Sequence, residues 1–165
     1  MNRIFDIIFS LIGLVVLSPL LILFCFLIWL NDFESPLYIA ERVGKNKKLF
    51  KMIKLRTMIK NADKNQVDST SSNDKRITKV GLIIRKFKLD EFTQLWNVLI
   101  GDMSLVGPRP NVLREVNLYT YLELNLLRLK PGITDFASIV FSDEGDILKN
   151  STDPDIDYNQ LIRPG

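Results

Sequence analysis

Two adjacent carboxylates, Asp90 and Glu91, are the residues of this 165-residue chain best placed to do chemistry. Apolar side chains recur around them at steps of three and four residues, which predicts an amphipathic helix that begins at the pair and ends at Gly101. Cations flank this helix: Arg85 precedes it, and Arg109 stands between two prolines after it. Two carboxylates between fixed cations could bind a metal ion and phosphates, although a helix N-cap with solvated charges has the same composition.

Composition narrows the chemistry further. The chain has no histidine and a single cysteine, Cys25, which excludes histidine-dependent triads, the common histidine metal sites, cysteine zinc sites and an internal disulfide. Any catalysis must therefore come from carboxylates and cations. The net charge of +3 is weak evidence for a polyanionic partner, and no nucleic acid is expected.

The chain contains a long apolar stretch, from Ile4 to Leu30, that could place this site at a membrane. As a helix it would reach about 40 Å, more than the hydrocarbon core of a bilayer. Pro19 should kink it, and Ser18 can partly satisfy the carbonyls that the proline leaves free. The helix either crosses the bilayer or dips in and returns, and hydropathy alone favours crossing. We expect residues 1–30 to form this membrane helix and residues 31–165 a cytoplasmic domain, because lysine and arginine follow the helix.

Two short strands are predicted after the helix, Leu37–Val43 and Leu49–Leu55, joined into a hairpin by residues 44–48. Lys54 and Arg56 stand two residues apart at its end, hence on one face of an extended segment. That spacing suits a phosphate. A solvated edge strand with protective lysines is at least as common an explanation.

The segments beyond the hairpin alternate between loops and helices. Residues 60–76 contain almost no apolar side chains and are predicted to be a mobile loop, either a lid or a plain linker. Apolar spacing returns in Ile77–Lys86, so a helix should deliver Arg85 close to the carboxylate pair.

The last part of the chain is predicted from its leucines and turn residues. Asn111–Lys130 reads as one helix whose wide leucine face would lie on a membrane surface or on its own domain. Pro131–Thr134 is a turn signal, and Phe136–Phe141 could be a short strand. The end at Gly165 suggests a truncated or naturally short form.

An ordered series of motifs resembles one known family. It comprises Arg3–Asp6, Leu17–Pro19, Glu41–Gly44, Phe50–Met52, Lys54–Met58, Arg76–Gly81, Leu89–Glu91, Gln94–Leu99, Gly101–Pro110 and Lys130–Thr134. Together they look like the bacterial sugar transferases, the monotopic phosphoglycosyl transferases that begin glycan assembly. The resemblance implies an α+β fold: a re-entrant helix broken at Ser18-Pro19, with both ends cytoplasmic, and a small domain of amphipathic helices with a β-hairpin. The resemblance therefore favours a re-entrant helix over the crossing helix that hydropathy alone favours.

The resemblance also implies an activity at the cytoplasmic face of the bacterial inner membrane. Such enzymes transfer a phosphosugar from a UDP-sugar to a polyprenyl (undecaprenyl) phosphate and release UMP. Asp90 would be the nucleophile and Glu91 its partner in a catalytic dyad, with Mg²⁺ bound at both. The basic side chains that would contact the substrate phosphates are Lys54, Arg56, Arg85 and Arg109.

One departure and two alternatives accompany the resemblance. Asp135–Ser138 replaces the Gly-Trp-Ala-Gln common in the family, and the following Ile139–Gly145 resembles a subgroup of small enzymes that act on amino or deoxyamino sugars. A metal-dependent hydrolase of nucleotide sugars or lipid diphosphates could use the same carboxylates. A non-catalytic adaptor could instead bind anionic lipid through cations such as Lys47 and Lys48.

Overall fold

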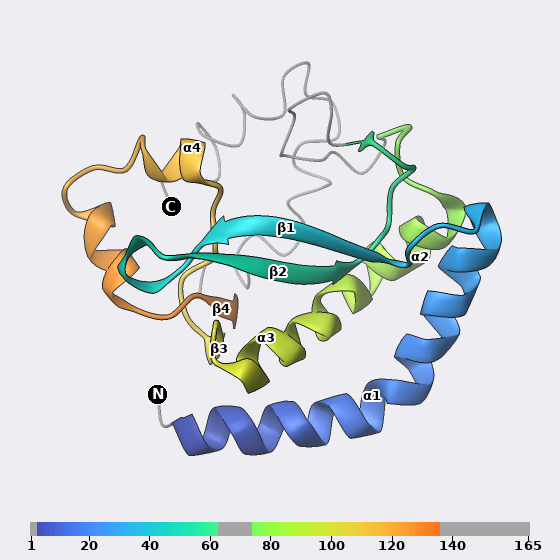
Figure 1. Ribbon diagram of the computed structural model, residues 1–165, viewed down its shortest axis with the longest axis horizontal. Helices are drawn as coiled ribbons and strands as arrows, with labels where there is room; N and C mark the ends of the chain where they lie inside the picture. The colour runs from blue at the N-terminus through green and yellow to red at the C-terminus, as the bar shows by residue number, and fades with distance from the viewer. Residues whose placement is uncertain (1–2, 63–73, 136–165) are drawn as a thin grey trace.

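The computed structural model describes residues 3–62 and 74–135 (Figure 1). They form both helices and strands, in agreement with the predicted α+β class. In chain order the elements are α1 (Arg3–Asp32), β1 (Leu37–Val43), η1 (Lys45–Lys47), β2 (Leu49–Leu55), α2 (Lys79–Lys86), η3 (Leu89–Gln94), α3 (Leu95–Ile100), β3 (Ser104–Val106), α4 (Leu113–Val116), η4 (Glu123–Arg128) and β4 (Gly132–Thr134). Most of the predicted loop 60–76 and the predicted strand Phe136–Phe141 lie outside the described residues.

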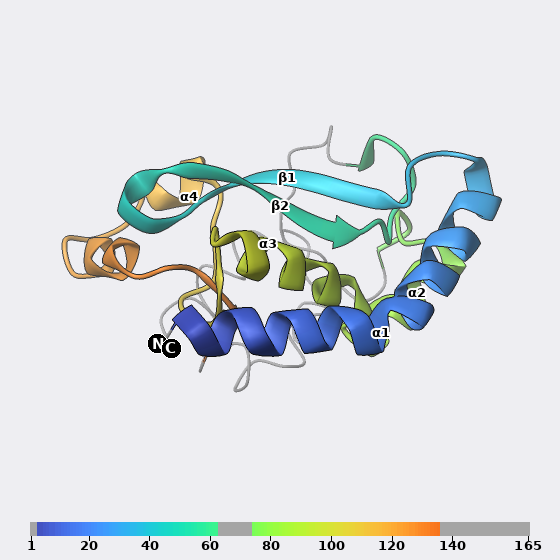
Figure 2. The same ribbon diagram turned by 60° about the horizontal axis from the view of Figure 1, so that its bottom comes forward.

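The apolar stretch forms a single helix, α1, with Pro19 inside it. Proline cannot donate to the carbonyl four residues earlier, and here the Ser18 hydroxyl donates to that Val15 oxygen at 2.8 Å, as predicted. Figures 1 and 2 show that the first half of α1 runs beneath the domain, whereas its second half rises along one side. Proline is the usual cause of such a change in direction. The helix ends where Phe33 adopts a left-handed conformation and its N–H donates to the Trp29 carbonyl.

The β1–β2 hairpin has the predicted bounds. Its strands are antiparallel, and Leu37 pairs with Leu55 while Val43 pairs with Leu49. Met52 is buried and Phe50 packs against the same cluster, so both side chains lie on the inner face of β2.

Asn97, fully buried on α3, covers the other edge of β2. Its side-chain amide accepts from the Ile53 N–H at 3.0 Å and donates to the Lys51 carbonyl at 2.8 Å. One side chain thus supplies the hydrogen bonds that a third strand would make, and it fixes α3 against the hairpin.

Two expectations for the last third of the fold are wrong. Gly132–Thr134 is not a turn but the strand β4, which pairs in parallel with β3. The pairing needs glycine at close approach, because a Cβ on Gly132 would lie 2.1 Å from the backbone nitrogen of Gly107.

The single helix predicted for Asn111–Lys130 is also absent. In its place are α4 and the 3₁₀ helix η4. Thr120 and Glu123 form a reciprocal capping box, in which each backbone N–H donates to the other residue's side chain. That box starts a new helical segment where leucine periodicity alone suggested a continuous helix.

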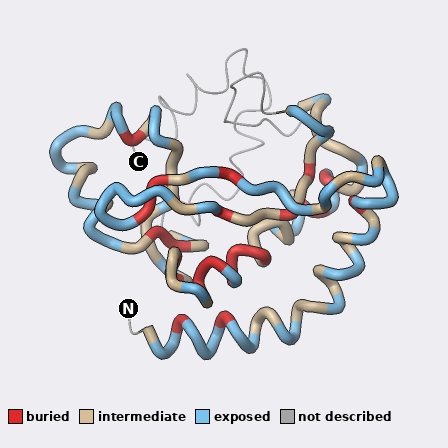
Figure 3. Tube along the Cα trace, in the orientation of Figure 1, coloured by how far each residue is buried: buried red, intermediate tan, exposed pale blue. Residues whose placement is uncertain are grey.

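Two apolar clusters hold the parts together, and Figure 3 shows that buried residues gather in α3 and along the hairpin, while α1 stays largely exposed. The first cluster joins the hairpin to α3 and contains Ala40, Met52, Val98 and Met103. The second joins the second half of α1 to the end of β2 and to α2, and its buried members are Ile28, Leu55 and Ile84. Lys54 thus stands between Met52 of the first cluster and Leu55 of the second, and the pair Asp90–Glu91 between Ile84 of the second and Val98 of the first.

Candidate active site

The carboxylate pair lies on η3, not in the first turn of an α-helix as predicted. Lys88 takes a left-handed conformation (φ 52°) that ends α2 and starts η3, whose first turn carries Asp90 and Glu91. The α-helix α3 follows only from Leu95, and Gly101 (φ 101°) ends it as predicted. Thr93 fastens η3 to the hairpin, because its hydroxyl lies 3.0 Å from the Ile53 carbonyl oxygen. A 3₁₀ segment before an α-helix is common, and periodicity does not distinguish the two.

Lys54 on β2 reaches both carboxylates. Its Nζ lies 3.1 Å from Glu91 Oε1 and 3.7 Å from Asp90 Oδ2. The three side chains are shielded to similar degrees, with 15% of Asp90, 21% of Lys54 and 28% of Glu91 exposed. The predicted substrate contact Lys54 therefore belongs to the immediate surroundings of the dyad.

Burial raises the pKa of Asp90 above the ordinary aspartate value, because a charged carboxylate loses hydration there. The Lys54 ammonium opposes that rise, the neighbouring Glu91 carboxylate adds to it, and Arg85 opposes it more weakly. Asp90 is thus a poorly hydrated carboxylate whose charge depends on two cations.

Arg85 lies in the last turn of α2 and acts on the charge of Asp90, in agreement with its prediction as a neighbour of the pair. The start of α2 is anchored to the segment after β2. The Thr78 hydroxyl caps α2 by accepting from the Gly81 N–H at 2.9 Å, and the Thr78 N–H donates to the Thr57 carbonyl. Arg85 Nε in turn donates to the Thr57 hydroxyl at 2.8 Å. Thr57 therefore sets both the position of α2 and the direction of the Arg85 side chain.

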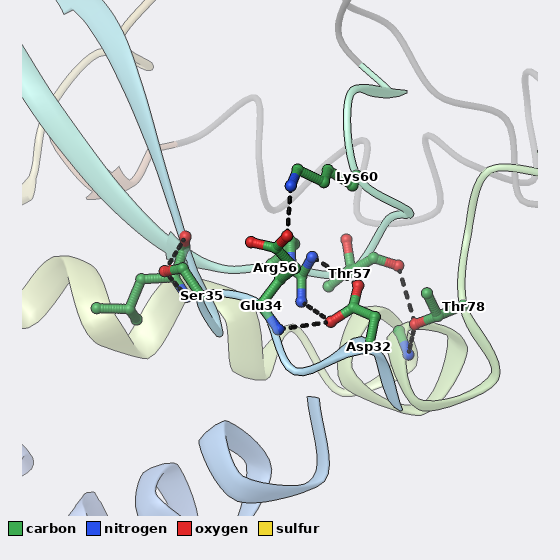
Figure 4. A network of polar contacts seen from close by, with 9 residues as sticks. Asp32, Glu34, Ser35, Arg56, Thr57, Lys60 and Thr78 are labelled. Carbon is green, nitrogen blue, oxygen red and sulfur yellow. Dashed lines mark hydrogen bonds and ion pairs between the residues drawn. The ribbon is translucent and has the colours of Figure 1, made fainter. Parts of the chain in front are cut away.

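Arg56 does not share the partners of Lys54, although the two side chains were predicted to act together. Its Nη1 and Nη2 donate to the two carboxylate oxygens of Asp32, at 2.8 and 2.6 Å (Figure 4). Asp32 is the last residue of α1. A substrate phosphate would have to displace this bidentate pair to reach both Nη groups, so contact between Arg56 and substrate stays a prediction.

Arg109 is exposed in the loop after β3, and its backbone N–H donates to Asp135 Oδ2 at 3.1 Å. It is not among the charges that shift the pKa of Asp90, whereas Lys54 and Arg85 are. The structure thus brings two of the four predicted basic residues to the dyad and leaves Arg56 and Arg109 with other neighbours.

A metal ion at this site would depend on the dyad alone. Within residues 3–62 and 74–135, no cluster of three or more acidic, histidine or cysteine side chains is arranged to hold a metal. Lys54 lies nearest to Asp90 Oδ2 and Glu91 Oε1, and the oxygens of these two carboxylates would be the protein ligands of the metal. Two carboxylates fit Mg²⁺, which commonly takes one or two protein oxygens and completes its shell with substrate phosphates and water.

Sequence reasoning missed two residues that dock the start of α1. Asp6 is 3% exposed, and its carboxylate accepts from the Ser104 hydroxyl at 3.0 Å and from the Leu105 N–H at 3.2 Å. Arg3 donates to the carbonyls of Val98 and Leu99 at the end of α3. The available signal was the charge of Asp6 inside an apolar run, since such a group needs a specific partner.

The acidic dyad lies with the cations Lys54 and Arg85 in a chain whose helix α1 is long and apolar enough to cross a membrane. The chain belongs to the bacterial sugar transferase family, whose model matches residues 1–163. This match confirms the resemblance carried by the sequence motifs.

Three relatives illustrate the family. The chain is 38% identical to the exopolysaccharide production protein ExoY of Sinorhizobium fredii, over 84% of this chain and 68% of that protein. It is 45% identical to a putative undecaprenyl-phosphate N-acetylgalactosaminyl 1-phosphate transferase of Bacillus subtilis, over 66% and 61%. It is 40% identical to the undecaprenyl-phosphate galactose phosphotransferase of Salmonella typhimurium, over 81% of this chain but 31% of that protein. The chain thus spans from about a third to two thirds of these relatives.

Proposed function

We propose that this protein transfers a phosphosugar from a UDP-sugar to a polyprenyl phosphate such as undecaprenyl phosphate, releasing UMP, as the first membrane step of glycan assembly. The observation that carries the proposal is the Asp90–Glu91 dyad, poorly hydrated and held by Lys54. Two of the relatives are named for transfer to undecaprenyl phosphate, which supports the same acceptor.

Asp90 would act as the nucleophile. One of its carboxylate oxygens attacks the phosphorus that carries the sugar, the bond from that phosphorus to the bridging oxygen breaks, and UMP leaves with the oxygen. The product is an acyl phosphate between Asp90 and the sugar. A phosphate oxygen of the polyprenyl phosphate then attacks the same phosphorus, which frees the Asp90 carboxylate and yields a polyprenyl diphosphate sugar. No histidine is needed, because both attacking groups are already anions.

The residues around Asp90 have separate tasks in this scheme. Lys54 and Arg85 lower the pKa of Asp90 and so oppose the effect of its burial, and their charges would also offset the negative charge that phosphates bring to the site. Asp90 and Glu91 would hold Mg²⁺, which neutralises phosphate oxygens when bound. Lys54 and Glu91 therefore set the charge of the nucleophile as well as its position.

We propose further that α1 re-enters the membrane from the cytoplasmic face. Its apolar surface is exposed over most of its length, as at Val16 and Ile22, each 68% exposed. Both of its ends nevertheless make polar contacts with the same domain, through Asp6 at the start and Asp32 at the end. A helix tied at both ends to one domain dips into a bilayer more readily than it crosses one, and it would keep the dyad near the lipid phosphate.

The test is UMP release from a panel of UDP-sugars by the full chain in lipid nanodiscs, with and without undecaprenyl phosphate and Mg²⁺. We expect full turnover only with lipid, Mg²⁺ and one class of UDP-sugar, and its loss in Asp90→Asn. The control is Asp102→Asn, which removes a carboxylate in the turn after α3 that does not shift the pKa of Asp90. Continuous release without lipid would show a hydrolase, and full activity of Asp90→Asn would contradict the proposal.

A further inference from the structure

The two halves of α1 are attached to the domain in different ways. The first half is held by Arg3 and Asp6 and by the close approach of Gly13 to Leu95, where an added Cβ would lie 2.9 Å from the leucine side chain. The second half rests on the apolar cluster around Ile28 and on the Asp32–Arg56 ion pair. Pro19, which cannot donate a backbone hydrogen bond, lies between the two halves. The second half can therefore change direction at the proline if its own attachment is lost.

The ion pair has the features of a strong attachment. It is bidentate, with N–O distances of 2.6 and 2.8 Å, and the Arg56 side chain is only 12% exposed. A further donor of the same group, Arg56 Nε, is buried and has no hydrogen-bond partner among the described residues. Loss of the Asp32 charge would leave a shielded guanidinium without its counter-ion, a state that is strongly disfavoured.

Arg56 also belongs to the four-residue segment that supplies the site. Lys54, two residues earlier, contacts both carboxylates of the dyad, and Thr57, the next residue, accepts the hydrogen bond from Arg85. The Arg56 N–H donates to the Pro36 carbonyl at 2.8 Å, which joins the start of β1 to the same segment. Figure 4 shows the end of α1 meeting this segment through Asp32. The end of α1 is thus bonded, through the Arg56 side chain, to the segment that places the cations of the site.

We propose that the Asp32–Arg56 ion pair is a positioning device that sets the height of the Asp90–Glu91 dyad relative to the membrane, and that it serves the lipid-dependent half of the reaction. The inference rests on the proposed function. The nucleotide sugar reaches the dyad from water, whereas the polyprenyl phosphate reaches it from the bilayer around α1. A change in the direction of the second half of α1 would misplace the lipid phosphate while leaving the nucleotide sugar contacts in place.

A neighbouring ion pair provides a matched control. Glu34 and Lys60 also pair across the α1–β1 connection, but their side chains are 44% and 61% exposed. Exposed pairs contribute little, because water screens them and two long side chains must be ordered. The Glu34–Lys60 pair is more exposed than Asp32–Arg56, and Lys60 lies outside the segment from Lys54 to Thr57.

The experiment separates the two halves of the reaction in nanodiscs. Exchange of labelled UMP into the UDP-sugar, without lipid acceptor, reports formation and reversal of the covalent intermediate. Transfer to added undecaprenyl phosphate reports the second half. We expect Asp32→Asn to keep exchange within about twofold of wild type and to lower kcat/KM for the lipid by about 10- to 100-fold, the scale of a small misplacement. Asp32→Glu should recover most of the lipid-dependent activity, and Glu34→Gln should match wild type.

The contrary outcomes are distinct. Equal losses in exchange and lipid transfer by Asp32→Asn would show a general structural role and overturn the inference, as would wild-type lipid kinetics in that variant. An equal loss in Glu34→Gln would show that any charge change in the connection has the same effect. Absence of UMP exchange in the wild-type protein would refute the covalent function itself, and the inference with it.

Discussion

Asp6 and Asp90 are two shielded carboxylates in opposite circumstances. Both oxygens of Asp6 lie 3.0 Å from the Ser104 hydroxyl, and one also accepts from a backbone N–H, so this carboxylate is held by donors within the protein. Asp90 has Lys54 at 3.7 Å on one oxygen and the like-charged Glu91 as its neighbour. Shielding alone therefore does not mark a reactive carboxylate. What marks Asp90 is a charge that depends on removable neighbours, Lys54 and Glu91.

The largest effect is expected from Asp90→Asn, which should separate the function of Asp90 from that of Asp6. Asp90→Asn should lower turnover by at least about 10³-fold, because the amide is not a nucleophile. Its thermal stability in nanodiscs should not fall, since the substitution removes a poorly hydrated charge. Turnover assays and melting temperatures on the same preparation check both parts. A variant that loses stability and activity together would place Asp90 with Asp6 as a structural residue.

Asp6→Ala should show the reverse pattern, a loss of stability first. The substitution leaves the Ser104 hydroxyl and the Leu105 N–H without their acceptor in a buried place, at a cost of about 1–3 kcal/mol. Urea unfolding monitored by fluorescence measures it. Asp6→Asn keeps one acceptor oxygen and should cost less. Unchanged stability with lost UMP exchange would assign Asp6 to the chemistry instead.

Lys54→Met should change the pH dependence as well as the rate. Lys54 lowers the pKa of Asp90, so its removal raises that pKa further, and the acidic limb of the pH–rate profile moves to higher pH. We expect turnover at pH 7 to fall by about 10- to 100-fold, because a preorganised charge is also lost. Lys51→Met, on the same strand and exposed, is the control. A lower rate with an unmoved acidic limb would show that Lys54 acts only on the substrate.

Glu91→Gln should give the smallest shift, in the opposite direction. The Glu91 charge raises the pKa of Asp90, so its neutralisation lowers that pKa and moves the acidic limb to lower pH. The absolute rate will also change if Glu91 holds Mg²⁺, so the position of the limb is the quantity to compare. A limb that moves upward would contradict the electrostatic coupling of the two carboxylates.

Local pattern predicted much of this molecule. The hairpin follows from alternation and glycine placement, and both strands have the expected bounds. The acidic pair and Arg85 were singled out from residue type and spacing, Lys54 was predicted as a phosphate contact, and the structure brings them together. The hairpin depends on neighbours in sequence, whereas the ion pair of Lys54 with Glu91 joins residues 37 apart in the chain.

Contacts between distant segments were not predictable in the same way. The parallel pairing of Ser104 with Gly132 and the amide of Asn97 on β2 depend on packing that no periodicity shows. Arg56 was grouped with Lys54 by spacing, but Asp32 holds it from the far end of α1. The predicted helix is broken between α4 and η4, where Thr120 and Glu123 form a capping box. This stretch contains both the capping box and the leucine periodicity, and the periodicity alone does not show the break.

The most direct test of the account is mass spectrometry of the protein after incubation with its UDP-sugar and Mg²⁺ in the absence of lipid acceptor. We expect the mass of one sugar phosphate on the peptide that contains Asp90, its absence in Asp90→Asn, and its release on addition of undecaprenyl phosphate. A turnover-competent protein that carries no such adduct, or an adduct that persists in Asp90→Asn, would contradict the assignment of Asp90 as the nucleophile.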